Sequence, residues 1–518
     1  MSAPTETTPS ARLSSTSLPM LPRRAVEWLS VFGPGAVIAS LTIGAGELIF
    51  SSRGGAIFGY RLLWFFSVVL LLKWGLVYTA ARHMVLTGAH PFERWMELPG
   101  PRGWFPLVLF LLALVCFPIW VGFHAGTVGT LVSWLAGTES SLGGTAYYLW
   151  AIVVLSSVLA LVFTGGYARL ERLQLIITLL MLFCVVISLF LLKPDWVEFL
   201  KGLLIPQSLH YPPWISTQPD IAGRPVWVET ITYVGIIGGS GYDYLAYVSY
   251  LRDKRWGQAG AAIADRSQLD AMANDPTHLN RQWLRAPLID CTLSFLAVLV
   301  FAAVFVACGA IVLGPQHKVP TGTNLLSLQS EFITPIYPWL KWVYFVGAFL
   351  AMLGTLYGTI EVAPTILREM AASLKPAHNT FRNTRLRRWA VWWVGLGGMA
   401  LLVGSFVYSL SSHGKTPPGL IAIITPANLF TGVLACGLVC LLNLWMDFRF
   451  LPRPLRMSHA LSLLNLVAGI IFLALGLKGY WDHSGWSSIA ILVGTIALGW
   501  IVASKESFVK STRETNAT

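Results

Sequence analysis

The sequence carries little charge. Only 12% of its 518 residues are Asp, Glu, Lys or Arg, whereas 55% are hydrophobic and the mean hydropathy is +0.64. Soluble domains carry about 25% charged residues, so too few polar residues remain here to cover so much apolar surface. Strict alternation of polar and apolar residues is also missing from the hydrophobic runs, which excludes a transmembrane β-barrel. The composition therefore predicts an all-α integral membrane protein.

Several chemical signatures are missing as well. The six cysteines lie inside or at the edge of apolar runs, and none has the spacing of a zinc site or a redox motif. Neither an HExxH motif nor a phosphate-binding loop nor a nucleophile–base pair is visible, so we expect no enzyme and no cofactor. Residues 1–24 lack the apolar core of a signal peptide and are predicted to be a disordered cytoplasmic tail.

Long apolar runs fill most of the chain. A membrane-spanning helix needs about 20 apolar residues, and twelve runs meet that length. They lie near residues 31–58, 60–82, 105–135, 146–165, 172–193, 226–250, 286–314, 338–370, 389–411, 419–446, 456–479 and 486–503. We therefore expect about twelve transmembrane helices in one domain, residues 25–503, followed by a cytoplasmic tail, residues 504–518.

The basic residues are distributed unevenly between the two sides of the membrane. The net charge is +12, and with a cytoplasmic N-terminus 26 of the 36 basic residues fall on the inner side. Positive charge on cytoplasmic connectors is the usual determinant of orientation. This predicts a multi-pass protein of the plasma or inner membrane with both termini in the cytoplasm. The charge is thereby explained without nucleic acid, and the lipid bilayer is the expected partner. The sequence does not indicate an oligomeric state.

Two of the runs are interrupted by glycines beside a carboxylate. The first run contains Gly44-Ala45-Gly46-Glu47, and the sixth contains Gly238-Gly239-Ser240-Gly241 with Asp243 close behind. Glycine lets a helix unwind, and unwound backbone at bilayer depth is tolerated only where protein or a watery cavity satisfies it. Broken helices at matching positions in two halves of a membrane protein point to a transporter's substrate site.

The spacing of the two breaks also predicts a repeat. The broken runs are the first and the sixth, so equivalent helices are an odd number of crossings apart. The second unit must then be inserted upside down relative to the first. Runs 1–5 and 6–10 are expected to form an inverted repeat, with runs 11 and 12 at the periphery.

The residue types at the breaks predict a cation site. Glu47 and Asp243 add negative charge near the midplane, where a carboxylate is costly without a partner. Oxygen-rich sites suit Mg²⁺, Ca²⁺ or Mn²⁺, and no Met or Cys lies in either break to supply a softer ligand. Glu47 and Asp243 are the predicted metal ligands, and the predicted binding residues are Gly44, Ala45, Gly46, Glu47, Gly239, Ser240, Gly241, Tyr242 and Asp243. The alternative is that the two carboxylates only cap the half-helices.

Two further polar residues are candidates for coupling. His124 could relay protons, because imidazole titrates near neutral pH, or it could be a hydrogen-bonded structural histidine. Glu361 could face the bundle interior or approach the cytoplasmic end of its helix. Of the remaining charged residues in the runs, Asp290 is expected to pair with Arg285 or Arg281. Lys73 is expected to snorkel or to pair with a carboxylate.

Three segments resemble one family of transporters. Gly33-Pro34-Gly35, the first break and the stretch from Gly54-Gly55-Ala56 to Leu63-Trp64 resemble the first helix of the Nramp divalent metal-ion transporters. Residues 166–173 (GYARLERL) are similar to that family's link into helix five, and Leu288-Ile289-Asp290 through Phe305 to its helix seven. The resemblance implies a LeuT-type 5+5 inverted repeat with two peripheral helices.

The same comparison identifies departures from the family pattern. Where the family has Asp-Pro-Gly-Asn in the first helix, this chain has Gly44-Ala45-Gly46-Glu47. Where the family has Met-Pro-His in the sixth helix, this chain has about Gly239-Ser240-Gly241. Acidic positions of the family's third helix fall on about Trp120 and Phe123. This indicates a divergent branch without the usual metal-binding motifs, closer to the magnesium-transporting members. We therefore expect a secondary-active transporter of a Mg²⁺- or Mn²⁺-like ion that works by alternating access, with the ion as its substrate.

Two other functions remain open at this point. Ile43-Gly44-Ala45-Gly46 also resembles the glycine-rich break of amino-acid transporters with the LeuT fold. Glu47 opposes a substrate carboxylate because like charges repel strongly in low dielectric, but an organic cation would escape that objection. The third possibility is a membrane receptor or sensor that has lost transport.

Overall fold

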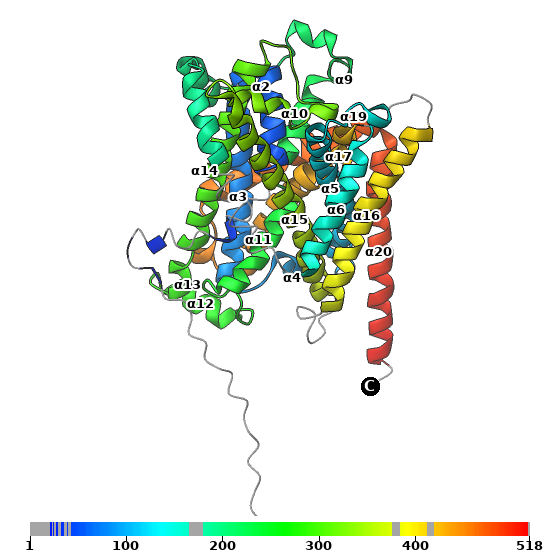
Figure 1. Ribbon diagram of the computed structural model, residues 1–518. Helices are drawn as coiled ribbons and strands as arrows, with labels where there is room; N and C mark the ends of the chain where they lie inside the picture. The colour runs from blue at the N-terminus through cyan, green and yellow to red at the C-terminus, as the bar shows by residue number, and fades with distance from the viewer. Residues whose placement is uncertain are drawn as a thin grey trace, which may run out of the picture.

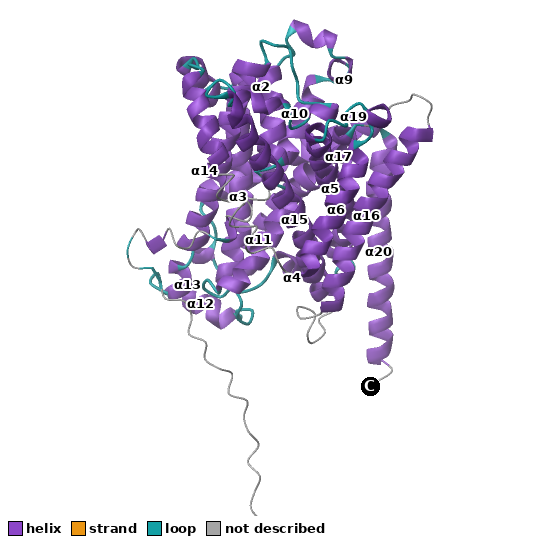
Figure 2. Cartoon of the chain, in the orientation of Figure 1, coloured by secondary structure: helices purple, strands orange, loops and turns teal. Residues whose placement is uncertain are grey.

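The computed structural model describes residues 21–22, 24, 27–28, 33–35, 39, 43–164, 180–374, 384–411 and 419–515. These residues are helical and contain no strand (Figure 1 and Figure 2). Eight described helices are long and apolar enough to cross a membrane, and two shorter apolar helices accompany them. The predicted all-α membrane class is confirmed. Most of the predicted tail 1–24, and the family-like segment 166–173, lie outside the described residues.

Every predicted apolar run has a helical counterpart in the part of the chain that is described. In chain order these are η2 (Ala45–Ser51) with α2 (Ser52–Phe58), η3 (Gly59–Leu62) with α3 (Leu63–Thr87), α5 (Trp104–Leu135), α6 (Tyr147–Thr164), Leu180–Leu191, α10 (Val226–Ile236) with α11 (Gly241–Lys254), α14 (Arg285–Cys308) with η6 (Gly309–Leu313), α15 (Lys341–Leu374), α16 (Thr384–Ser411), α17 (Leu420–Asn428) with η11 (Leu429–Leu434) and α18 (Ala435–Phe450), α19 (His459–Ser484) and α20 (Trp486–Thr515).

Short helices lie in the connectors. They are α4 (Pro91–Trp95), α8 (Trp196–Leu204), α9 (Pro219–Ala222), α12 (Arg266–Asn274) and α13 (Leu279–Gln282), with 3₁₀ turns η4 (Ser141–Gly144), η5 (Pro213–Thr217), η7 (Gly322–Asn324), η8 (Leu328–Phe332), η9 (Pro338–Leu340) and η12 (Arg453–Leu455). In Figure 1, α12 and α13 lie at the same end of the molecule as the C-terminus. α20 continues as a helix to Thr515, well into the predicted tail 504–518.

Four helices form a common scaffold. α5 packs against α6, α15 and α16, and α15 also packs against α16. The last two helices are peripheral, because only 28% of the most apolar window of α19 and 17% of that of α20 is buried in the protein. Figure 1 shows α20 along one edge of the bundle. This low burial agrees with the peripheral position predicted for runs 11 and 12.

The second break is an unwound segment of four residues. α10 ends at Ile236 and α11 begins at Gly241. Gly238 and Gly239 between them have φ values of +79° and +98°, in the region that only glycine enters without strain. The first break has fewer non-helical residues in the part of the chain that is described. Only Ile43 and Gly44 are non-helical there, and Glu47 already belongs to the π-helical turn η2.

Asp290 bonds to backbone rather than to an arginine. It lies on α14, and its carboxylate accepts the amide hydrogens of Gly33 at 3.0 Å and Gly35 at 2.8 Å. Tyr247 of α11 donates its hydroxyl to the same carboxylate at 3.0 Å. The expected pairing with nearby arginines was wrong, because two free amides at a helix start offer a carboxylate equally good donors within the protein. Asp290 thus ties the start of the first run to α14 and α11.

Glycine allows the second half of the first helix, α2, to lie directly on α14 and η6. A Cβ atom at Gly55 of α2 would overlap the carbonyl oxygen of Val306, and one at Gly309 would overlap that of Ser52. Neither obstacle is a flexible side chain, so neither can move aside cheaply. This reciprocal contact explains why the family-like Gly54-Gly55-Ala56 segment needs small residues.

We expect Gly55→Ala to destabilise the protein by about 1–3 kcal/mol, because overpacking against backbone forces the two helices apart. Gly404→Ala is the matched control, since a Cβ atom added at Gly404 of α16 would have no neighbouring atom within 4 Å. That variant should gain roughly 0.5–1 kcal/mol from its better helix propensity. Thermal unfolding of the purified variants in detergent measures both. Equal midpoints for the two variants would contradict the close contact.

Candidate functional site

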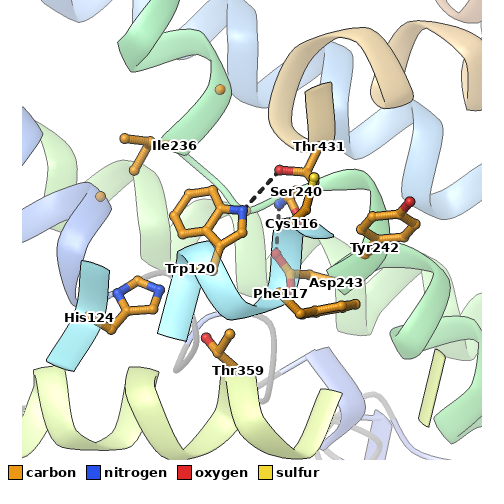
Figure 3. Close-up of a pocket in the computed structure, with 13 residues that line it drawn as sticks. Cys116, Phe117, Trp120, His124, Ile236, Ser240, Tyr242, Asp243, Thr359 and Thr431 are labelled. Carbon is orange, nitrogen blue, oxygen red and sulfur yellow. Dashed lines mark hydrogen bonds between the residues drawn. The ribbon is translucent and has the colours of Figure 1, made fainter. Parts of the chain in front are cut away.

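A small cavity lies between the two breaks and the scaffold. Its space open to water is about 40 Å³, which is enough for more than one water molecule. Residues from η2, α5, α10, α11, α15 and η11 meet there (Figure 3). The lining residues are Gly46, Cys116, Phe117, Trp120, His124, Gly235, Ile236, Gly239, Ser240, Tyr242, Asp243, Thr359 and Thr431. Of the predicted binding residues, Gly46, Gly239, Ser240, Tyr242 and Asp243 are brought together at this wall.

Asp243 both caps α11 and faces the cavity. Its Oδ2 atom accepts the amide hydrogen of Ser240 at 2.8 Å, which satisfies one of the free donors at the helix start. Figure 3 shows this bond and the carboxylate beside Phe117. The capping role that the sequence suggested is therefore present. It occupies only one of the two oxygens, so capping and ion binding are compatible.

His124 is buried at the cavity without a full set of hydrogen bonds. Its imidazole is 4% exposed, and its Nδ1 atom has no hydrogen-bond partner among the described residues. The ring stacks on Trp120 with centroids 5.4 Å apart and an interplanar angle of 26°. Trp120 in turn donates its indole N–H to Thr431 at 3.1 Å, as Figure 3 shows. The histidine is thus held in place by stacking, while a polar atom stays available.

Glu47 lies behind the wall that Gly46 forms. Its side chain is fully buried, and neither carboxylate oxygen has a hydrogen-bond partner among the described residues. It is not one of the lining residues of the cavity. The buried Lys73 ammonium lies within electrostatic range of both Glu47 and Asp243. The two predicted metal ligands are therefore both subject to the field of the same buried positive charge.

Lys73 occupies carbonyls that we expected to face an ion. Its Nζ atom donates to the carbonyl oxygens of Ile237 and Gly239, both at 2.7 Å, and lies 3.4 Å from that of Gly235. The expected snorkelling was wrong, and in place of an ion pair with a carboxylate the ammonium group bonds to backbone carbonyls. The side chain points into the bundle because the unwound segment offers unpaired carbonyls there.

The remaining predicted residues lie outside the cavity wall. A Cβ atom at Gly44 would overlap the Thr355 hydroxyl, and one at Gly241 would lie 3.3 Å from Ala435, so both glycines serve packing. The side chain of Ala45 lies outside the described part. Glu361 does not line the cavity: it forms an ion pair with Arg387 of α16 at 2.5 Å. That ion pair gives Glu361 a structural role in joining α15 to α16.

Several cavity residues carried no signal in the sequence. Cys116 and Phe117 come from α5, Thr359 from α15 and Thr431 from η11. None of these helices is broken by glycine, so only their packing brings them to the site. Cys116 places a sulfur at the wall, although neither break contains Met or Cys. Lys73, which does not line the cavity, was recognised in the sequence as a lysine in an apolar run, but its carbonyl partners were not.

Comparisons with known proteins identify the family and the fold of the chain. The family model described as natural resistance-associated macrophage protein-like, Nramp, matches residues 35–482. The chain belongs to the Nramp family. The structure is similar to the crystal structure of the Eremococcus coleocola manganese transporter in complex with an aromatic bis-isothiourea substituted compound, with 16% identity, a TM-score of 0.64 and coverage of 97% of this chain and 99% of that one.

Two further solved structures share the fold. A histidine-to-alanine mutant of the Eremococcus coleocola manganese transporter is similar at 16% identity and a TM-score of 0.63, over 95% of this chain and 97% of that one. MhsT in complex with L-phenylalanine is similar at 15% identity and a TM-score of 0.53, over 87% of this chain and 98% of that one. No curated protein matches the chain. The LeuT-type fold is thereby confirmed.

Family membership decides the broad class of the protein. This Nramp-family chain is a multi-pass membrane transporter of a divalent metal ion and not an enzyme. The metal ion is its substrate, so no resident cofactor is needed.

The double role of Asp243 can be separated by two substitutions. We expect Asp243→Ala to lower the free energy of unfolding by about 1 kcal/mol, because the cap on the Ser240 amide is lost. Asp243→Asn keeps a cap acceptor and should cost less. Asp265→Ala, which removes the cap of α12 on the Gln268 amide, is a matched control outside the cavity. Denaturant unfolding in detergent compares them, and a larger loss for Asn than for Ala would contradict the capping geometry.

Proposed function

We propose that the chain transports a hard divalent cation, Mg²⁺ or Mn²⁺, by alternating access, and that the ion binds in the cavity between the two breaks. The observation that carries the proposal is the wall formed by Asp243, Ser240 and His124, with the buried Glu47 behind it. Asp243 is the direct carboxylate ligand in this proposal. Glu47 supplies the second negative charge.

The charge of the site supports a cation. Glu47 and Asp243 are two negative groups, and Lys73 is the positive group within their electrostatic range. One negative charge is therefore left over when all three are ionised. In the low dielectric of a buried site this attracts a cation and repels a carboxylate.

The donor set supports an ion that keeps some of its water. No group of three or more His, Cys, Asp or Glu placed to hold a metal occurs in the described residues. Mg²⁺ does not need such a group, because it usually binds through one or two carboxylates and keeps several waters. The hydroxyls of Ser240 and Thr359 are suited to hold those waters. Oxygen donors suit Mn²⁺ as well as Mg²⁺, and the thiol of Cys116 and the imidazole of His124 are donors that transition-metal ions accept more readily than Mg²⁺ does. The solved relatives from Eremococcus coleocola are manganese transporters.

An organic substrate is the second candidate. MhsT, which shares the fold, was solved with L-phenylalanine. The cavity in this chain has about 40 Å³ of open space, whereas pockets for organic ligands usually hold about 300–1,000 Å³. The size of the cavity thus favours an ion. A receptor or sensor without transport is the third candidate, which flux measurements distinguish.

Two sets of polar contacts, one on each side of the cavity, support alternating access. Arg53 of α2 pairs with Glu229 of α10 at 2.5 Å, and Tyr233 donates to the same carboxylate at 2.8 Å. The outer halves of both broken helices can therefore move as one unit. Asp290 holds the opposite end of the first run. In our proposal these helices rock against the scaffold of α5, α6, α15 and α16.

Uptake into liposomes tests the substrate. The purified protein should accumulate Mg²⁺ or Mn²⁺ from a panel that also contains Ca²⁺, L-amino acids and methylated amines. Flux of an amino acid or an amine without metal flux would replace the proposal with the second candidate. Absence of any flux under an imposed membrane potential and pH gradient would favour the sensor.

Two carboxylate variants test the binding residues. We expect Asp243→Asn and Glu47→Gln each to raise the half-saturating metal concentration by about tenfold or more, because each removes one negative charge from a buried site. Glu198→Gln is the matched control, since Glu198 pairs with Lys201 on the surface with about half of each side chain exposed. Unchanged uptake by Glu47→Gln would remove Glu47 from the site.

We also propose that both tails, residues 1–24 and 504–518, lie in the cytoplasm and flank the transporter domain, residues 25–503. An epitope tag after Thr518 should then be stained only in permeabilised cells. A tag inserted beside the exposed Ile205 in the connector between α8 and α10 should be stained in intact cells. The reverse staining would contradict the orientation that the basic residues predict.

A further inference from the structure

The ammonium group of Lys73 lies among backbone carbonyl oxygens, where a bound cation could lie. Lys73 lies near the middle of the 25-residue helix α3, and its side chain is 0% exposed. A lysine at bilayer depth costs about 2.5–3.5 kcal/mol on insertion scales, which the surrounding groups must offset. A side chain that could reach the membrane surface would avoid this cost. Lys73 instead turns its ammonium group toward the second break.

The ammonium group is surrounded by backbone carbonyls. Ile237 and Gly239 each accept a bond of 2.7 Å, and Gly235 completes the set at 3.4 Å. The left-handed conformations of Gly238 and Gly239 turn the chain so that these oxygens face one point. They lie at and just after the C-terminal end of α10, which carries the negative end of the half-helix dipole. Such a cage of oxygens suits a small monovalent cation.

The neighbouring groups complete the cage and its charge. Tyr244 donates its hydroxyl to the carbonyls of Gly238 at 2.7 Å and Gly239 at 3.1 Å. Glu47 and Asp243 lie within electrostatic range of Lys73. Without the lysine, three carbonyls and two carboxylates would share a buried space with no positive charge in it.

We propose that Lys73 is a built-in monovalent cation, which permanently fills a carbonyl cage that would otherwise bind a sodium, potassium or ammonium ion. The transported metal then binds beside it and meets one net negative charge when Glu47 and Asp243 are both ionised. Transport needs no dissolved monovalent ion at this position. The cage is assigned from backbone geometry and stands apart from the identity of the cargo; only the uptake assay below rests on the proposed metal transport.

The wild-type protein offers the first test. Its metal uptake should be unchanged when all Na⁺ and K⁺ are replaced by N-methyl-D-glucamine, a cation too large for the cage. A requirement for Na⁺ or K⁺ in the wild type would overturn the proposal, because the lysine would then not suffice.

Removing the charge should open the cage to dissolved cations. We expect Lys73→Met to lower metal uptake by about 10- to 100-fold in N-methyl-D-glucamine buffer, the usual effect of losing a group next to a metal site. Methylammonium, Na⁺ or K⁺ should restore part of that loss. Lys478→Met is the matched control, because Lys478 pairs with Asp482 and is 57% exposed. Its uptake should not respond to these ions.

A binding measurement keeps this test apart from the identity of the cargo. Methylammonium at saturating concentration should raise the unfolding midpoint of Lys73→Met by about 2 °C or more and leave the wild type unchanged. This shift is expected even where no metal is transported, so its presence with absent metal flux would refute only the proposed cargo. Metal uptake by Lys73→Met equal to wild type, or a lack of both rescue and midpoint shift, would refute only the cage.

A second variant covers the case in which Lys73→Met does not fold. Lys73→Met combined with Glu47→Gln removes one charge of each sign and should fold better than Lys73→Met alone. Failure of the double variant to fold, while Glu47→Gln folds, would assign Lys73 to packing and overturn the proposal.

Discussion

The unwound peptide groups between Ile236 and Gly241 impose the main constraint on this structure. Hydrocarbon offers them no hydrogen bonds, so the protein must satisfy them from within. Lys73 and Tyr244 donate hydrogen bonds to the carbonyls, and Asp243 accepts one from the Ser240 amide. A cavity able to hold water and an ion can exist at this depth because its walls have already met that demand.

This solution brings charges into the membrane that must balance one another. A buried charge is tolerated when its partners are well placed, and it is costly when a partner is missing. Arg53 and Glu229 meet the first condition, with Pro320 and Tyr233 as further partners, and they hold two helices together. Glu47 and His124 each retain a buried polar atom without a hydrogen-bond partner in the described part of the chain. That difference separates a structural ion pair from groups that are available to a ligand.

Much of the candidate site could be predicted, because residues that are energetically unfavourable in a membrane-spanning helix stand out in the sequence. Glycines and carboxylates within apolar runs are unfavourable there, which pointed to both breaks and to Asp243 and His124 before their positions were known. The partners of the charged residues were harder to predict. Asp290 bonds to two amides rather than to an arginine, and Glu361 pairs with Arg387 outside the cavity. Each of these choices depends on where a neighbouring helix places its donors.

Membrane class, helix number and the location of the two interruptions follow from local properties, since hydrophobic length and glycine content act within one segment. The donor set of the cavity is different, because Cys116, Thr359 and Thr431 come from unbroken helices that resemble any other apolar span. The direction of Lys73 likewise depends on carbonyls that lie more than 150 residues away in the chain. Packing between distant helices selects these contacts, and no single segment contains the information to specify them.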